Sequence, residues 1–221
     1  MRLREHRNCG LGLIEVLIII ATIGFLLVYL SMLNRQPGAR ASRINCVSNL
    51  KQLGLAMRMF ANDHEDKFPW EVPLEKGGTF ELPSNDPTPH FVAVSNELVT
   101  PKVLKCADDR ERTRSSGFAG LSRGNLSYFI GLEANISNVQ SILAGDRNVT
   151  GGTVSNSVLV LNTSSSQVGW GKNLHNRAGN IGLADGSAQQ VTESGMNKQL
   201  QSWRWSRVDW VTNETVRFII P

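Results

Sequence analysis

The chain is predicted to be an α+β protein in which a long, kinked N-terminal helix packs on a small, mostly antiparallel β-sheet domain. Three observations in its 221 residues predict this class. An apolar run near the N-terminus has the length of a membrane span, and an apolar stripe with helical spacing follows it. The second half of the chain then alternates short apolar runs with turn residues, which is typical of an antiparallel sheet.

The first apolar run extends from Leu11 to Leu33 and would be about 34 Å long as a helix, enough to cross a hydrocarbon core of about 30 Å. Its one charged residue is Glu15. An acid inside a lipid bilayer costs a few kcal/mol unless it is paired, so Glu15 is expected to have a functional partner. The expected partner is an α-amine.

The first ten residues set the expected orientation, because three arginines against one glutamate form a short basic flank and such flanks stay in the cytoplasm. We therefore expect a single-pass membrane protein with its C-terminal domain outside. These ten residues carry half of the formal net charge of +4, and the remainder is too small to predict a nucleic-acid partner. The basic residues past the membrane run are expected to form a solvated helix face: Arg35, Arg40, Arg43, Lys51 and Arg58.

The segment Gly10-Leu11-Gly12-Leu13-Ile14-Glu15, behind its basic leader, resembles the cleavage and methylation site of type IV prepilins and type II secretion pseudopilins. The resemblance implies that a prepilin peptidase cuts after Gly10, that Leu11 is N-methylated, and that Glu15 serves in assembly. It also implies a pilin-like fold in the inner membrane, with a periplasmic or extracellular domain. The implied partners are like subunits in a filament, the inner-membrane assembly machinery and the lipid bilayer.

Two other interpretations of this N-terminus stay open. In the first, an ordinary secretory signal is cleaved before Ser42, since residues 39–41 imitate a small-x-small site, although the apolar run is longer than such signals need. In the second, a plain signal anchor keeps the leader, with Glu15 a tolerated polar residue near the membrane edge. The first residue of the mature protein distinguishes the three, because it is Leu11, Ser42 or Met1.

Four parts of the chain are expected. They are a cytoplasmic leader (1–10), the transmembrane half of the helix (11–33), its exoplasmic continuation (34–66) and a globular β-rich domain (67–221). The helix is predicted to continue through residues 34–66 because apolar residues there are spaced alternately four and three positions apart. This is the spacing of a helix face that packs on a core. The stripe consists of Cys46, Leu50, Leu53, Met57 and Phe60.

Proline and glycine predict the shape and the end of this helix. Pro37 and Gly38 are expected to kink it, because an internal proline removes a hydrogen bond. The helix should end near residues 62–66, because Phe68-Pro69 cannot continue it. The acids around His64 lack the ligand spacing of a calcium loop, so we interpret them as a solvated helix end.

The globular domain is expected to open with an irregular loop over residues 71–90 and to continue as strands. Asp185-Gly186 predicts a two-residue hairpin turn, and residues 194–202 predict a short helix. The expected strands are Leu126 to Ile130, Ser141 to Ala144, Val158 to Leu161, Asn180 to Ala184, Ala188 to Val191 and Val216 to Ile220.

Cys46 and Cys106 would both lie on the oxidising side of the membrane, where an even number of cysteines is compatible with a disulfide. A bond between them would close a loop of about sixty residues and contribute on the order of 4 kcal/mol. The alternative is two separate small buried residues. A count of free thiols in denatured, unreduced protein distinguishes the two.

His175, nine intervening residues and Asp185-Gly186 lie within HNRAGNIGLADGSAQQV, which resembles the C-terminal motif of a group of prepilin-like proteins from Planctomycetes and Verrucomicrobia. Three other segments agree with that group: NCVSNLKQLGLAMRMFANDHEDKFP, LKCADD and SILAGDRN. The resemblance names a family and leaves the role of His175, Asp185 and Gly186 unknown.

Two interpretations of this motif stay open. His175 and Asp185 could converge across the hairpin and bind a metal or a neighbouring subunit, with Asp146 as a third acid. Alternatively Asp185-Gly186 makes the turn, while His175 hydrogen-bonds backbone or Asp185 and holds the preceding loop. The turn interpretation is favoured, so no metal and no cofactor are expected.

An enzyme is not expected, because the chain has no G-x-S-x-G elbow, no H-E-x-x-H and no phosphate loop. Trp203 and Trp205 would share a face if their segment is extended, which indicates core packing more than a ligand platform with Trp210. The predicted function is a structural subunit of a pilus or a type II secretion pseudopilus. The alternative is a membrane-anchored periplasmic binding domain that does not polymerise.

Overall fold

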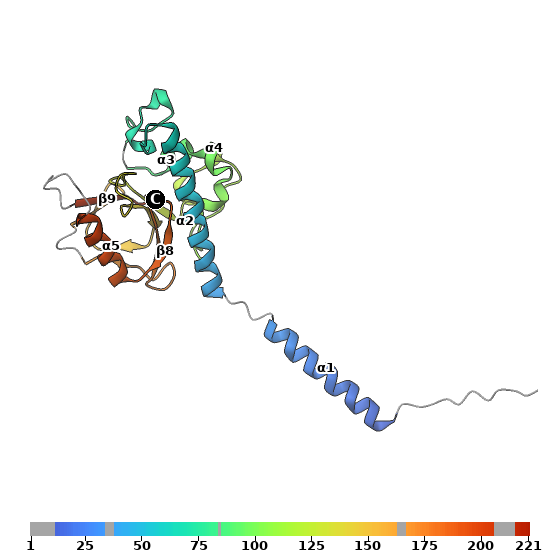
Figure 1. Ribbon diagram of the computed structural model, residues 1–221. Coiled ribbons are helices and arrows are strands. Elements are labelled where there is room, and N and C mark those ends of the chain that lie inside the picture. Colours follow the sequence, from blue (N-terminus) through green and yellow to red (C-terminus); the bar gives the residue numbers. More distant parts are fainter. Residues whose placement is uncertain (1–11, 34–37, 84, 163–166, 206–214) are drawn as a thin grey trace, which may run out of the picture. The chain divides into compact units, whose positions relative to one another are not determined.

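The computed structural model describes residues 12–33, 38–83, 85–162, 167–205 and 215–221 (Figure 1). The chain divides into two compact units, Met1–Gly38 and Ala39–Pro221. The predicted leader, its cleavage site at Gly10 and Leu11, and the predicted kink at Pro37 lie outside the described residues. The protein is α+β, with an N-terminal apolar helix and an antiparallel sheet, as the sequence predicts.

The first unit contains α1 (Leu13–Leu33). All its described side chains, up to Ser31, are exposed within the unit. Its start is capped by the carboxylate of Glu15, whose Oε2 accepts a hydrogen bond from the Gly12 backbone N–H at 3.0 Å. Among the described residues it is the one helix that is long and apolar enough to cross a membrane. Its length and composition support a membrane anchor.

The second unit contains α2 (Gly38–Asp63) from its second residue onward, and this helix carries the predicted apolar stripe. All five stripe residues are buried, from Cys46 at 0% to Phe60 at 3% exposure, so the predicted helix face is confirmed. The helix also ends where Phe68-Pro69 predicts. Beyond it the His64 ring lies 2.7 Å from the Phe60 carbonyl oxygen and 3.0 Å from that of Lys76, and the neighbouring acids are exposed.

The main sheet has seven strands in the order β4-β5-β9-β1-β2-β7-β8, and every neighbouring pair is antiparallel. Its strands are β1 (Tyr128–Gly131), β2 (Ile142–Asp146), β4 (Thr153–Ser155), β5 (Val158–Asn162), β7 (Gly179–Leu183), β8 (Ala188–Val191) and β9 (Thr215–Ile219). A separate pair joins β3 (Val149–Thr150) to β6 (Gly169–Trp170). The six predicted strands are all present. β3, β4 and β6 were not predicted, because two or three residues make no apolar run.

The remaining described elements of the domain are seven short helical segments and one longer helix, α5. They are η1 (Pro69–Glu71), η2 (Leu74–Lys76), α3 (Thr88–Ala93), α4 (Ser95–Leu98), η3 (Pro101–Leu104), η4 (Phe118–Gly120), η5 (Arg123–Asn125) and α5 (Glu193–Trp205). The expected irregular loop at 71–90 therefore contains short helical elements. The predicted helix at 194–202 is α5, and its extension to Trp205 overturns the extended geometry assumed for Trp203 and Trp205.

The sheet separates two hydrophobic cores, because alternate side chains of a strand point to opposite faces. Tyr128 and Ile130 of β1 pack with the α2 stripe, whereas Phe129 between them packs with the other core. That second core includes the apolar side of α5, and its Trp203 is 2% exposed. Figure 1 shows α2 and α5 on opposite sides of the sheet. Trp203 is therefore a core residue. It is not available to form a ligand-binding surface with Trp205 and Trp210.

The turn between β7 and β8 differs from the prediction. The Gly186 N–H donates to the Leu183 carbonyl at 2.9 Å, and the Leu183 N–H donates to the Ser187 carbonyl at 2.8 Å, so the loop has three residues. Gly186 has φ +83°, a left-handed conformation that glycine adopts without a Cβ clash. The turn lies against α2, since a Cβ added to Gly54 would be 3.0 Å from the Cα of Gly186. Close backbone packing therefore accounts for glycine at position 54, and the left-handed φ accounts for glycine at position 186.

Candidate functional site

The candidate site centres on His175, in the loop between β6 and β7. His175, Asn176 and Arg177 have φ of +51°, +49° and +62°, three successive left-handed residues without a glycine. Such backbone costs on the order of 1–3 kcal/mol per residue and persists only where its surroundings hold it. Asn148 supplies that support, because its Nδ2 lies 2.9 Å from the carbonyl oxygens of Gly171 and Leu174 and 3.2 Å from that of Ala178.

The loop directs the imidazole of His175 into the domain, where the side chain is fully buried. Its Nε2 lies 3.3 Å from Cys106 Sγ and 3.4 Å from Asp146 Oδ2. Its Nδ1 lies 3.2 Å from Asp108 Oδ2, at ion-pair distance but without the alignment of a hydrogen bond. The ring therefore has a sulfur and a carboxylate at one nitrogen and a second carboxylate at the other.

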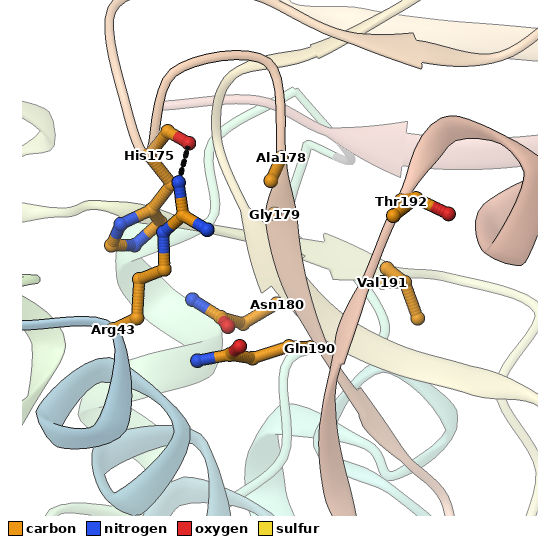
Figure 2. A pocket seen from close by; sticks show the side chains of 8 residues that line it. All are labelled: Arg43, His175, Ala178, Gly179, Asn180, Gln190, Val191 and Thr192. Carbon is orange, nitrogen blue, oxygen red and sulfur yellow. Dashed lines mark hydrogen bonds between the residues drawn. The ribbon is translucent and has the colours of Figure 1, made fainter. Parts of the chain in front are cut away.

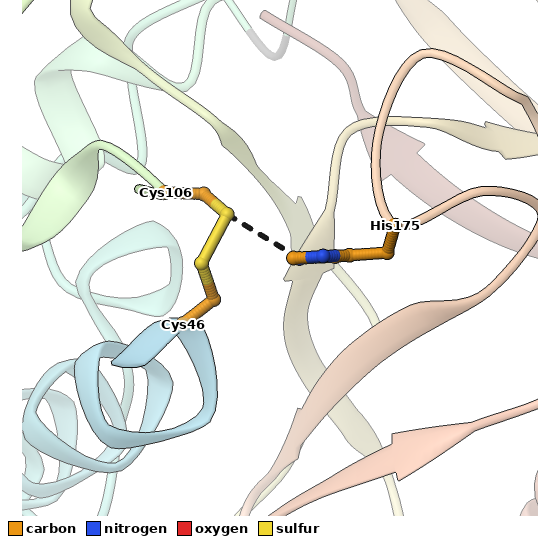
Figure 3. A group of neighbouring side chains, drawn as sticks. All are labelled: Cys46, Cys106 and His175. Atoms are coloured by element: carbon orange, nitrogen blue, oxygen red, sulfur yellow. Dashed lines mark hydrogen bonds between the residues drawn. A yellow bond between two sulfur atoms is a disulfide. The ribbon is translucent and has the colours of Figure 1, made fainter. Parts of the chain in front are cut away.

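A disulfide joins Cys46 on α2 to Cys106, which follows η3, across a sequence separation of 60 residues. Both cysteines are 0% exposed. Figure 3 shows the His175 imidazole pointing toward the bonded sulfurs. Of the two alternatives that the sequence leaves open, the structure has the bonded one. The crosslink ties α2 to the segment that also carries Asp108.

Asp146 ends β2 and is 0% exposed. Its Oδ2 accepts hydrogen bonds from the backbone N–H and the side-chain amide of Asn180, both at 2.8 Å. Its Oδ1 has no hydrogen-bond partner among the described residues. Burial raises the pKa of Asp146 to about 8, against the lowering effect of the two Asn180 bonds, and burial also lowers the pKa of His175. Both directions favour uncharged side chains in this cluster.

The next residue along the chain, Arg147, forms an ion pair beside the cluster. Its Nε lies 2.7 Å from Asp109 Oδ2, and its Nη2 lies 2.6 Å from Glu111 Oε2. Burial raises the pKa of Asp109, but the hydrogen bonds from Arg147 and Ser127 outweigh it and the pKa is lowered. Asp109 is therefore a carboxylate paired with a cation, whereas Asp146 close by is buried without one.

A cavity of about 230 Å³ opens beside His175. Its lining includes Arg43, His175, Asn180 and Gln190, and the Arg43 guanidinium donates a hydrogen bond to the His175 carbonyl oxygen. Figure 2 shows the amide ends of Asn180 and Gln190 pointing toward the side on which Arg43 lies. Polar side chains from α2, β7 and β8 thus meet at this opening. Arg43 is part of that lining and not only a member of a solvated helix face.

Asp185 does not join His175. Its side chain is exposed, and its Oδ1 accepts a hydrogen bond from the Ser187 backbone N–H at 2.8 Å within the turn. Arg58 donates to the adjacent Ala184 carbonyl at 3.0 Å, which fastens the turn to α2. Of the two interpretations that the sequence leaves open, the convergence of His175 with Asp185 is therefore wrong, and Asp185-Gly186 makes the turn as the favoured interpretation expects. The His175 ring contacts Cys106, Asp108 and Asp146 in place of the backbone or Asp185 partner of that interpretation, and Asp146, the suggested third acid, does lie near it.

Several residues of the site were not predicted: Arg43, Asp108, Asn148 and Asn180. One signal was available for Asp108, because it lies two residues after Cys106 and any partner of that cysteine would lie near it. The other three have no sequence signal, since an asparagine that supports a loop looks like any polar residue until the loop is closed.

The fold and the site define an α+β protein with an N-terminal apolar helix, whose domain encloses a histidine, two carboxylates and a disulfide. Comparison of the chain with protein-family models, with curated proteins and with solved structures finds no match. Functional inference therefore rests on the residues of this chain.

Proposed function

We propose that the protein is a prepilin-like structural subunit, cleaved after Gly10 by a prepilin peptidase and assembled through its N-terminal helix into a pilus or a type II secretion pseudopilus. The peptidase and the assembly machinery lie in the inner membrane. The globular domain is periplasmic or extracellular.

The observation that carries this proposal is the combination of apolar surface and a single acid in α1. Every described side chain of the helix is exposed, and Glu15 is its one charged residue. A surface of this kind is stable in a lipid bilayer or against other helices like itself. Both environments occur in turn if the subunit is stored in the membrane and then polymerised.

Glu15 provides the directional part of the mechanism. Its carboxylate accepts a hydrogen bond from the Gly12 N–H, so it lies at the N-terminal end of the helix. Cleavage after Gly10 would create an α-amine on Leu11, the residue before Gly12. An ammonium and a carboxylate attract each other far more strongly in a water-poor helix bundle than in water. A Glu15 that met no amine would penalise wrong registers between neighbouring subunits.

Substitution of Glu15 by leucine tests this mechanism, with Thr22→Leu as the matched control. Thr22 is a polar residue of the same helix whose hydroxyl donates to the Ile19 carbonyl of its own turn. We expect Glu15→Leu to insert and to be cleaved but to lose assembly, and Thr22→Leu to assemble normally. Filament yield in a sheared fraction and the mass of the mature N-terminus measure both steps. Filaments at wild-type levels from Glu15→Leu, or a mature chain that starts at Met1 or Ser42, contradict the proposal.

A second candidate function is a membrane-anchored binding domain that never polymerises. The cavity beside Arg43 and His175 favours it, since polar groups from three elements meet there. Photocrosslinkers placed in α1 separate the two functions. Crosslinks between the α1 helices of neighbouring copies support the filament, whereas a monomeric full-length protein without such crosslinks supports the binding domain.

A further inference from the structure

The side chains of Cys46, Cys106 and His175 form a cluster whose ligand atoms all lie within 4.8 Å of one another. All three residues are buried. In the disulfide form the sulfurs bond to each other. Every newly made chain nevertheless passes through a dithiol form, because disulfides form only after synthesis and in an oxidising compartment.

We propose that the dithiol form of the protein binds one Zn²⁺ through Cys46, Cys106 and His175, with Asp146 as the fourth ligand, so that metal binding and the disulfide are alternative states of the same side chains. The proposal does not depend on the proposed filament function.

Geometry at His175 supports this site. A tetrahedral Zn²⁺ with Zn–S near 2.3 Å and Zn–N near 2.0 Å separates a thiolate sulfur from an imidazole nitrogen by about 3.5 Å. The observed distance between Cys106 Sγ and His175 Nε2 is 3.3 Å. The imidazole is therefore already close to the position that a shared metal requires. After reduction of the disulfide, the sulfurs of Cys46 and Cys106 would have to move to about 3.7 Å from each other to bind the same tetrahedral Zn²⁺.

The other nitrogen of His175 lies near a carboxylate, the kind of group that orients metal-bound histidines, at ion-pair distance but without hydrogen-bond alignment in the disulfide form. Its Nδ1 lies 3.2 Å from the carboxylate of Asp108. A carboxylate at the far nitrogen orients a metal-ligating imidazole and raises its basicity, and loss of such a partner typically weakens metal affinity 10- to 100-fold. Asp108 is therefore a positioning residue in this proposal.

Asp146 is the proposed fourth ligand because it is a buried carboxyl beside His175, although it does not belong to the group whose ligand atoms lie within 4.8 Å of one another. Its Oδ1 has no hydrogen-bond partner among the described residues, although the residue is fully buried. Its Oδ2 lies 3.4 Å from His175 Nε2. A buried carboxylate oxygen without a partner is costly, and coordination to a cation would satisfy it. Two thiolates, an imidazole and a carboxylate suit Zn²⁺ better than Ca²⁺ or Mg²⁺, which prefer oxygen ligands only.

The change from the disulfide form to the Zn²⁺ form takes place in two steps. A dithiol reductant delivers two electrons and two protons, the Cys46–Cys106 bond breaks, and the reductant becomes a disulfide. Zn²⁺ then displaces three protons into solvent, two from the thiols and one from the neutral Asp146 carboxyl. Of the four proposed ligands, His175 also lines the cavity of about 230 Å³ beside Arg43.

The test uses full-length protein in detergent micelles on a Cys9→Ser background, so that Cys46 and Cys106 are the remaining cysteines. The sample is reduced with a phosphine under anaerobic conditions and titrated with Co²⁺, whose absorption reports tetrahedral thiolate coordination, and then with Zn²⁺. We expect one Co²⁺ per reduced chain, displaced by Zn²⁺, and no such spectrum from the oxidised chain. A reduced chain without the tetrahedral spectrum overturns the proposal.

Variants assign the ligands. His175→Gln and Asp146→Asn should each weaken Zn²⁺ binding at least tenfold, and Asp108→Asn should weaken it 10- to 100-fold. His64→Gln is the matched control, because this histidine bonds to two backbone carbonyls away from the cluster, and it should bind as the parent does. Equal affinity in His175→Gln and His64→Gln would exclude His175 as a ligand and overturn the site.

Thermal unfolding provides a readout if reduction loosens the fold. Zn²⁺ should raise the Tm of the reduced parent and leave unchanged the Tm of a Cys46→Ser/Cys106→Ser double variant, because only a ligand that binds the folded state stabilises it. The same Tm shift in the double variant, or no shift in the reduced parent, contradicts metal binding by the two thiols.

Discussion

The His175 imidazole lies 3.3 Å from the sulfur of Cys106, although 69 residues separate the two in the chain. The contact links two features of the domain, the strained loop before β7 and the crosslink that ties α2 to the segment after η3. Because both are buried, a change in either is expected to affect the stability of the other.

Replacing both cysteines, as Cys46→Ala/Cys106→Ala, is expected to lower the free energy of unfolding by about 4 kcal/mol. The crosslink closes a loop across 60 residues and so limits the unfolded chain. Denaturant unfolding of the full-length protein in micelles, followed by circular dichroism, measures the loss. Reduced wild-type protein should unfold at nearly the same denaturant concentration as the double variant, and a large difference between them would contradict the chain-entropy account.

Asn148→Ala is expected to destabilise the protein by about 2–3 kcal/mol, because its amide is the donor that three carbonyls of the His175 loop share. Asn173→Ala is the control, since its amide donates to the exposed Glu111 carboxylate on the surface. Hydrogen exchange should also become faster at residues 174–178 in Asn148→Ala. Equal stability of the two variants would show that the loop holds its conformation without Asn148.

Gly54→Ala should destabilise the domain by about 1 kcal/mol net, because the added Cβ would meet the backbone of Gly186 at 3.0 Å and this overpacking exceeds the gain in helix propensity of about 1 kcal/mol. Gly120→Ala is the matched substitution, since nothing lies within 4 Å of its added Cβ. Thermal unfolding of both variants measures the difference. A Gly54→Ala protein as stable as Gly120→Ala would mean that the turn moves away from α2 without cost.

His90 predicts a pH dependence of stability. It is 2% exposed and lies 2.6 Å from the Thr79 hydroxyl, and burial lowers its pKa from 6.5 to about 4. Between these values the unfolded chain binds a proton that the folded chain does not, so stability is present above pH 6.5 and is lost as pH falls toward 4. The loss amounts to about 3 kcal/mol at most.

His90→Gln removes this titration. Its unfolding free energy should change less than that of the wild type between pH 7 and pH 4, as measured by denaturant titration at each pH. Parallel pH profiles for the two proteins would show that other groups dominate the acid sensitivity.

Much of the fold could be predicted from local pattern. The α2 stripe and the six longer strands follow from periodicity, and Phe68-Pro69 predicts the end of the helix. The three-residue loop at Gly186 could not be predicted, because two- and three-residue hairpins use the same Asp-Gly pair and differ in strand register. The short strands β3, β4 and β6 form only because longer neighbours place them.

The site could be predicted only in part. His175 and the two cysteines were identified one by one, and Asp146 was suggested as an acid near His175. Their common location, with Asp108 beside them, depends on how four separate segments meet.

Sequence by itself determined the apolar, single-acid character of α1, the amphipathic face of α2 and the strand pattern, because each depends on spacing within one segment. Tertiary structure alone decided that Arg43 meets the His175 carbonyl across 132 residues, that His175 turns toward the disulfide, and that Asp185 stays in its turn. Such contacts form only when distant segments of the chain fold against one another. The spacing of residues within one segment therefore gives no sign of them.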